Sequence, residues 1–161
     1  MGVTCTMCRI SPAELARASE DDVAAKLRYG ADGCLDLDKA WDGIAWLISD
    51  ERRRERMAML DPQTIETKAL FPVETIEAVG GKIGYVDPKL VAKIAAVLAP
   101  IDEATLRKRF DAKAMRASDV YPEIWDDGDD ALEYVLGHFE DMRELYRAAA
   151  AAGDCVLVRI E

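Results

Sequence analysis

The cysteine pair Cys5-x-x-Cys8 is the first spacing in this sequence that could carry chemistry. In thiol redox proteins such a pair opens a helix, whose N-terminus lowers the thiol pKa. Residues 2–10 instead read as a strand, and residues three apart in a strand point to opposite faces. We therefore predict that the two sulfur atoms lie on opposite sides of a strand as small packing residues and share no metal ion.

The other two cysteines, Cys34 and Cys155, form no second paired motif. A zinc site needs about four N or S ligands, and the chain adds only one histidine, His138, which lies on the flank of a helical apolar stripe. The sequence begins without the basic leader and apolar run of an export signal, and a cytoplasmic location keeps thiols reduced. We therefore expect a cytoplasmic protein with no disulfide, no metal, no other cofactor and a half-exposed, structural His138.

Acidic residues concentrate at 126–130, which reads Asp-Asp-Gly-Asp-Asp. An EF-hand loop requires acids at positions one, three and five, glycine at six and glutamate at twelve. Counted from Asp126, position three is Gly128 and position six is Ala131, so this template is not met. We expect these acids to stabilise the positive N-terminus of the helix that follows.

The chain is acidic, with a formal net charge of −10 shared between its halves. Such a balance repels phosphate backbones, and the basic clusters at 52–56 and 107–109 have no interleaved aromatic residues. No apolar stretch approaches the ~20 residues of a membrane span. The sequence therefore predicts neither a nucleic-acid nor a membrane partner. It leaves the oligomeric state open.

Helix starts are marked more clearly than strands in the first half of the chain. Ser11-Pro12-Ala13-Glu14 supplies an N-cap, a proline at the first helical position and a capping-box glutamate, for a helix expected to extend towards Leu27. Asp36 is expected to cap a second helix whose apolar stripe includes Trp41 and Ile48. Residues 51–72 are interpreted as a helix followed by a short helix.

The second half of the chain contains sharper boundaries. Gly80-Gly81 predicts a strand at 82–86, and Asp87-Pro88 opens a helix that closes at Pro100. Asp102 and Asp111 cap two short helices, and an irregular segment precedes a long helix at 129–152 and an inner strand at 155–160. The order predicts one α+β domain spanning 1–161, with a small sheet that includes both terminal strands and is covered by several helices.

Trp46 does not fit the expected stripe of its helix. It lies half a turn from that stripe, beside charged residues such as Lys39 and Asp42. Such an aromatic residue either packs beneath a second layer or lines a binding groove. Packing is the more common reason in a domain of this size.

The segment 35–41, Leu-Asp-Leu-Asp-Lys-Ala-Trp, resembles the YfbM-like family of bacterial proteins of unknown function. Agreement extends to the opening strand with 10–15, to Gly84-Tyr85, to 120–125 and to 156–158, nearly end to end. The resemblance implies a mixed helix-and-sheet domain and supplies no activity or substrate. The family pattern often has histidines at the positions of Ala45 and Asp42, and their absence here weighs against catalysis through those imidazoles.

Two functions are compatible with these observations. The first is a binding or interaction module without catalytic activity, for an unknown protein or small-molecule partner. The alternative is a small enzyme that uses carboxylate and tyrosine acid–base chemistry, with a site drawn from Asp38, Asp42, Tyr85, Asp119 and Tyr121. For either function we predict a pocket lined by residues from one set, which is Asp42, Trp46, Tyr85, Tyr121 and Trp125.

Overall fold

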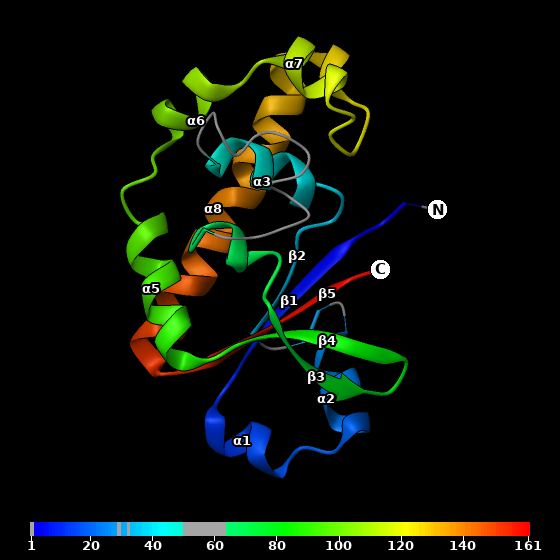
Figure 1. Cartoon of the computed structure of the whole chain (residues 1–161), viewed down its shortest axis with the longest axis vertical. Coiled ribbons are helices and arrows are strands. Elements are labelled where there is room, and N and C mark those ends of the chain that lie inside the picture. Colours follow the sequence, from blue (N-terminus) through cyan, green and yellow to red (C-terminus); the bar gives the residue numbers. More distant parts are fainter. Residues whose placement is uncertain (1, 29, 32, 50–63) are drawn as a thin grey trace.

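A five-stranded antiparallel sheet with the strand order β2-β1-β5-β4-β3 forms the centre of the computed structural model, which describes residues 2–28, 30–31, 33–49 and 64–161 (Figure 1). The strands are β1 (Cys5–Ile10), β2 (Cys34–Asp36), β3 (Glu74–Ala78), β4 (Gly81–Val86) and β5 (Cys155–Ile160). The two terminal strands pair along their whole length, from Cys5 opposite Ile160 to Ile10 opposite Cys155. The prediction of an α+β domain with paired terminal strands is confirmed.

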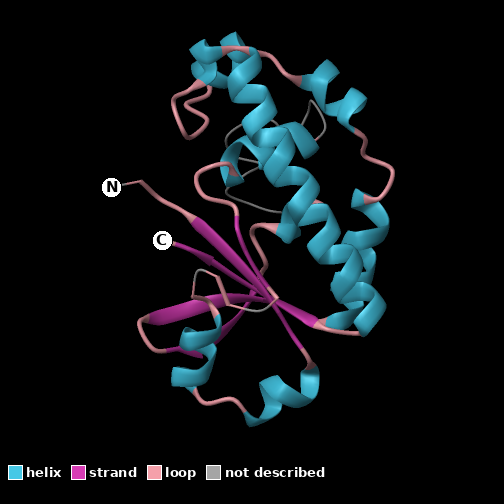
Figure 2. Cartoon of the chain, turned by 180° about the vertical axis from the view of Figure 1, so that it is seen from behind, coloured by secondary structure: helices cyan, strands magenta, loops and turns pink. Residues whose placement is uncertain are grey.

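Helices cover the two faces of this sheet unequally (Figure 2). One face carries α3 (Trp41–Ile48), α5 (Pro88–Leu98) and α8 (Asp129–Ala152), with α6 (Glu103–Arg109) and α7 (Ala112–Ala117) beyond them. The other face carries α1 (Pro12–Arg17) and α2 (Glu20–Lys26). Two short 3₁₀ helices, η2 (Thr67–Ala69) and η3 (Trp125–Asp127), lie in the connections.

Each face of the sheet carries its own apolar core, because the side chains of a strand alternate between the two faces. Cys5 and Met7 point into the larger core beneath α3, α5 and α8, whereas Cys8 and Ile10 point into the smaller core beneath α1 and α2. The predicted opposite orientation of Cys5 and Cys8 is therefore confirmed. In the larger core Tyr146 is fully buried and donates its hydroxyl proton to the carbonyl of Ala69 at 2.7 Å, so its polar atom is satisfied.

Local capping explains why the later helices begin where the sequence predicts. The carboxylates of Asp87, Asp102 and Asp111 each accept backbone N–H groups of the following turn. The long helix α8 begins at Asp129 and ends at Gly153, whose φ of 70° is the left-handed conformation that glycine adopts without a Cβ clash. Asp129 and Asp130 lie in its first turn, as predicted.

The first half of the chain departs from the sequence prediction at three points. The single helix expected from Ser11 towards Leu27 is two helices, because Ser19 and Asp22 form a capping box that starts α2. Asp36 ends the short strand β2 and accepts the N–H of Asp38 rather than capping a helix. Strand β3 was not predicted, and most of the helical interpretation of 51–72 lies outside the described residues.

A disulfide between Cys8 and Cys34 contradicts the expectation that every cysteine is a free thiol. The two residues are separated by 26 positions but are direct partners in the antiparallel pairing of β1 with β2. No strand was predicted at 34–36, so Cys34 was not expected to lie opposite Cys8. Cys5 and Cys155 are buried free cysteines.

None of the helices among the described residues is both long and apolar enough to cross a lipid bilayer.

Replacing Ser11 tests the boundary between β1 and α1. Its hydroxyl accepts the N–H of Glu14 at 3.1 Å, while the Glu14 carboxylate pairs with Lys26 instead of closing a capping box. We expect Ser11→Ala to lower the free energy of unfolding by about 1 kcal/mol in urea denaturation, whereas Ser11→Thr, which keeps the cap, retains most of it. An alanine variant that unfolds at the wild-type urea concentration would contradict this cap.

Candidate functional site

A buried carboxylate ties the start of α3 to the irregular segment that precedes η3. Asp42 is 8% exposed, and its Oδ2 atom accepts the backbone N–H of Tyr121 at 2.8 Å. The chain turns into this contact at Asp119, whose φ is 50°. Asp42 therefore positions the segment around Tyr121, where the sequence predicted a site.

Three half-buried rings, from Trp41, Phe71 and Tyr121, form what we call the aromatic cluster. The ring centroids of Trp41 and Tyr121 are 5.8 Å apart, and Phe71 meets Trp41 edge-on at 6.0 Å. The Tyr121 hydroxyl accepts the N–H of Val3, and the Trp41 Nε1–H donates to the carbonyl of Val3, both at 3.0 Å. These hydrogen bonds hold the N-terminal segment against the rings and fix their orientation.

The two remaining tryptophans of the molecule pack inside the larger core. Helix α3 is buried on all sides from Asp42 to Ile48, so Trp46, which is 5% exposed, packs beneath a second layer rather than lining a groove. Trp125 is 2% exposed, and its Nε1–H donates to the carbonyl of Val120 at 2.6 Å. Each ring therefore serves packing.

Tyr85 lies on the opposite face of the sheet from Asp42, Trp46 and Trp125. It packs against the smaller core, and its hydroxyl is 3.6 Å from Sγ of Cys155. Burial, and then the contact with Cys155, raise the pKa of Tyr85 to about 12, so the phenol stays protonated at neutral pH. The alternation of β4 therefore separates Tyr85 from Trp46 and Trp125, which pack on the other face of the sheet.

A polar contact that the sequence analysis missed joins α8 to the loop before α3. The Tyr134 hydroxyl donates to Oδ2 of Asp38 at 2.8 Å and accepts the N–H of Lys39 at 3.1 Å. Burial and the hydrogen bond to the Asp38 carboxylate raise the pKa of Tyr134. The half-buried His138 ring lies edge-on to the Tyr134 ring, with centroids 4.8 Å apart. The four-residue step from Tyr134 to His138 was the only sequence signal for this cluster.

The raised pKa of Tyr134 fits a structural hydrogen bond better than proton transfer at neutral pH.

Within the part of the chain that the structure describes, no three His, Cys, Asp or Glu side chains gather closely enough to hold a metal ion.

The sheet opens between β4 and β5 and leaves what we call the sheet-end hollow, about 300 Å³ in volume. The ladder of paired residues between these strands ends at Gly84 opposite Val158, and beyond it the β3–β4 hairpin and the C-terminal end of β5 diverge (Figure 1). Pro72 packs on Gly84, where an added Cβ would lie 2.4 Å from the proline Cγ. The remaining lining residues are Leu70, Thr75, Gly80, Gly81, Lys82, Arg159, Ile160 and Glu161.

A smaller hollow of about 210 Å³ is lined by Trp125, one of the residues predicted for the site, together with Val120. Its polar wall consists of Arg116, Asp119, Glu123 and Asp126. The Arg116 guanidinium forms an ion pair with the Asp126 carboxylate. Asp119 and Glu123 add further acidic side chains to this pair, so the wall of the hollow carries an excess of acidic groups.

The basic cluster at 107–109 also has internal partners. Arg107 pairs with Glu103 and Glu133, and Arg109 donates to the carbonyls of Leu47 and Ile48 at the end of α3. These contacts make the cluster a structural brace between helices. The cluster at 52–56 lies outside the described residues.

Comparison with known proteins agrees with this architecture. A family model for a domain of unknown function, DUF1877, matches residues 1–159. The chain belongs to the DUF1877 family. Its structure is similar to the crystal structure of YfbM, a protein of unknown function from Escherichia coli, with a TM-score of 0.73 and 19% identity over 98% of this chain and 99% of that one. No curated protein matches the sequence. The resemblance to the YfbM-like family is thus confirmed, and the DUF1877 fold carries no assigned activity.

A pair of helical glycines tests the packing beneath the candidate site. A Cβ at Gly43 would lie 2.7 Å from Cη2 of Trp125 and 3.1 Å from Cγ2 of Val135, whereas a Cβ at Gly137 would meet no atom within 4 Å. Overpacking costs roughly 1–3 kcal/mol, and replacing glycine by alanine in a helix gains about 1 kcal/mol. In urea denaturation we therefore expect Gly43→Ala to destabilise the protein and Gly137→Ala to stabilise it. Shifts in the same direction for both variants would contradict the packing of α3 on Trp125.

Proposed function

We propose that this DUF1877 protein is a binding module without catalytic activity, and that its ligand is an extended peptide segment of a protein partner held in the sheet-end hollow. The observation that carries the proposal is the end of the β4–β5 ladder at Gly84 and Val158. Beyond it, 81–83 and 159–161 do not pair with each other although both belong to or adjoin strands of one sheet. Strand backbones that stop pairing are templates for another extended chain.

The composition of the hollow supports a main-chain ligand. Gly81 leaves the backbone open to close approach, because no atom lies within 4 Å of the position of a Cβ there, whereas Pro72 already covers Gly84. Apolar side chains from Leu70, Pro72 and Val158 form the floor on the face of the larger core. A peptide could therefore add backbone hydrogen bonds along the strands and place alternate side chains on this floor.

The charges around the hollow favour the uncharged backbone of a peptide as the ligand over a small anion. Lys82 pairs with Glu77, and Arg159 pairs with Glu161 and donates to the carbonyl of Val79. Both cations therefore already have partners. Selectivity would come from shape and main-chain hydrogen bonding rather than from net charge.

The aromatic cluster borders the hollow through the chain segment 70–72. Leu70 and Pro72 line the hollow, and Phe71 between them turns to Trp41. The hydrogen bonds of Trp41 and Tyr121 to Val3 fix this border in place. A preorganised wall lowers the entropic cost of ordering a peptide against it.

The alternative of an acid–base enzyme has weaker support. Its residue set included Tyr85, which faces the opposite core, so the set does not converge. Tyr85 and Tyr134 have raised pKa values, which move their phenols away from proton transfer at neutral pH.

Filling the hollow tests the proposed function. Thr75 is exposed, lines the hollow and is paired with Gly84, whereas the neighbouring Glu74 is paired with Tyr85 on the other face. Peptides selected from a displayed random library against the wild-type protein should bind Thr75→Trp at least tenfold more weakly and Glu74→Trp with unchanged affinity. Thermal unfolding of both variants serves as the control for folding.

Two results would contradict the proposal. One is that no peptide is enriched on the wild-type protein. The other is that enriched peptides bind Thr75→Trp as tightly as they bind the wild-type protein.

A further inference from the structure

Cys8 and Cys34 lie opposite each other at the edge of the sheet where β1 pairs with β2. Their Cα atoms are 4.1 Å apart, and the neighbouring pair is joined by the Arg9 N–H donating to the Gly33 carbonyl at 2.9 Å. The cysteines therefore occupy a position between ladder hydrogen bonds, where side chains of facing strands come closest. Cys8 is fully buried, whereas Cys34 is only half-buried.

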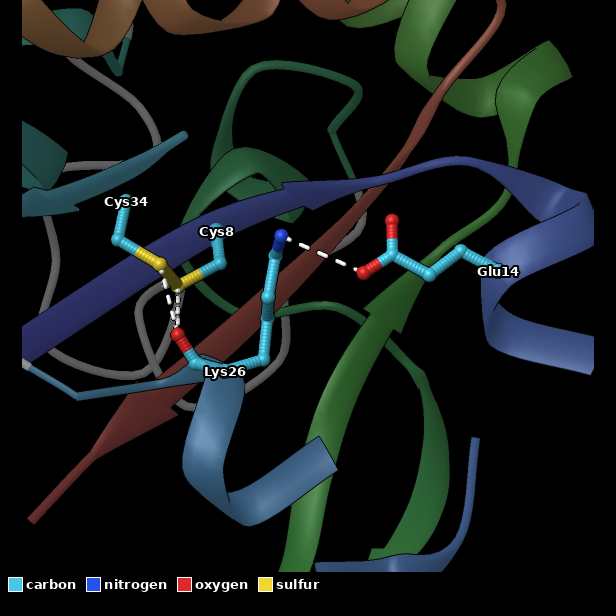
Figure 3. The surroundings of a disulfide bond; sticks show 4 residues. All are labelled: Cys8, Glu14, Lys26 and Cys34. Carbon is cyan, nitrogen blue, oxygen red and sulfur yellow. Dashed lines mark hydrogen bonds and ion pairs between the residues drawn. A yellow bond between two sulfur atoms is a disulfide. The ribbon is translucent and has the colours of Figure 1, made fainter. Parts of the chain in front are cut away.

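Both sulfur atoms lie next to the carbonyl group of Lys26, the last residue of α2 (Figure 3). The carbonyl oxygen of Lys26 is 3.1 Å from Sγ of Cys8 and 2.8 Å from Sγ of Cys34. Carbonyls in the last turn of a helix have no partner within that helix, so they need one elsewhere. A carbonyl oxygen has two lone pairs and can accept two thiol protons.

These positions suit two oxidation states of the same side chains. With the sulfurs joined, the pair forms a disulfide across β1 and β2. With the sulfurs reduced, the two atoms must move apart because they are no longer bonded, and a thiol beside the Lys26 carbonyl can then donate a weak hydrogen bond to it. No rearrangement of the strands is required for either state, because the register already places the two residues opposite each other.

We propose that Cys8 and Cys34 are a reversible redox site that exchanges with low-molecular-weight thiols and disulfides. In the oxidising direction the half-buried Cys34 loses its proton and attacks one sulfur of the external disulfide, which releases one external thiol and leaves a mixed disulfide. Cys8 then attacks the Cys34 sulfur, and its proton leaves with the second external thiol. Two protein thiols are thus oxidised and one external disulfide is reduced to two thiols.

The redox state is communicated to α2 and to the surface beside it. Oxidation removes both thiol donors from the Lys26 carbonyl while the covalent link holds β1 to β2. Lys26 also lines a hollow of about 450 Å³ between α1 and α2, together with residues that include Ile10, Arg17 and Ala31, and its ammonium pairs with Glu14 at 3.4 Å. The disulfide also closes the loop between positions 26 apart that contains α1 and α2, and such a cross-link restrains the enclosed segment more than a weak thiol hydrogen bond does. The end of α2 is therefore held more tightly in the oxidised protein than in the reduced one.

The first test equilibrates the folded protein with defined ratios of reduced and oxidised glutathione, followed by denaturation, alkylation and peptide mass spectrometry. We expect Cys8 and Cys34 to lose alkylation together as the ratio becomes oxidising, while Cys5 and Cys155 stay alkylated. Cys34→Ser should abolish the loss at Cys8, and Cys155→Ala should leave the paired loss intact. Pairing of Cys8 with any other cysteine, or a Cys8–Cys34 state that does not change at any ratio, would overturn the proposal.

The second test measures hydrogen exchange in the two states. Amides at the end of α2 should exchange several-fold more slowly in the oxidised protein, whereas α6, a helix of equal length on the other side of the sheet and outside the disulfide loop, should be unchanged. Equal exchange of α2 in both states would overturn the link between the redox site and the helix.

Discussion

The pairing of β1 with β5 is the constraint on which the rest of this structure depends. It brings the two ends of the chain into the middle of the sheet, so that each of its faces is lined from both ends of the sequence. Because side chains alternate along these strands, the same pairing divides the molecule into a large core beneath α3, α5 and α8 and a small one beneath α1 and α2. It also leaves Thr4 and Glu161 bonded to each other at the end where the sheet opens.

The functional proposals follow from what lies beside this pair. On one side of β5 the ladder with β4 stops and the sheet-end hollow begins, next to the aromatic cluster that is fixed by Val3. On the other side, β1 carries β2 and brings Cys34 to Cys8. The two proposed sites use opposite faces of the sheet, and each can be altered without changing the residues of the other.

Local signals in the sequence predicted local structure well. The caps at Asp87, Asp102 and Asp111 and the glycine after α8 are each satisfied within a few residues, so they can be recognised without the rest of the fold. Strands β2 and β3, the Cys8–Cys34 pair and the orientation of Tyr85 depend on partners far away in sequence. The position of Trp46 away from the apolar stripe did not indicate exposure, because α3 is buried on every side. The periodicity of this helix therefore does not separate an inner from an outer face. Asp42 does contact the Tyr121 segment through a backbone hydrogen bond, but no sequence signal indicated the hollow between β4 and β5.

The most direct test of the binding account is the amide chemical-shift map of the ¹⁵N-labelled protein titrated with a peptide selected against it. The account predicts that the largest changes fall at 81–84 and 158–161, where the two strands separate. Changes concentrated around Trp125 and Asp126, or on the Tyr85 face of the sheet, would contradict it.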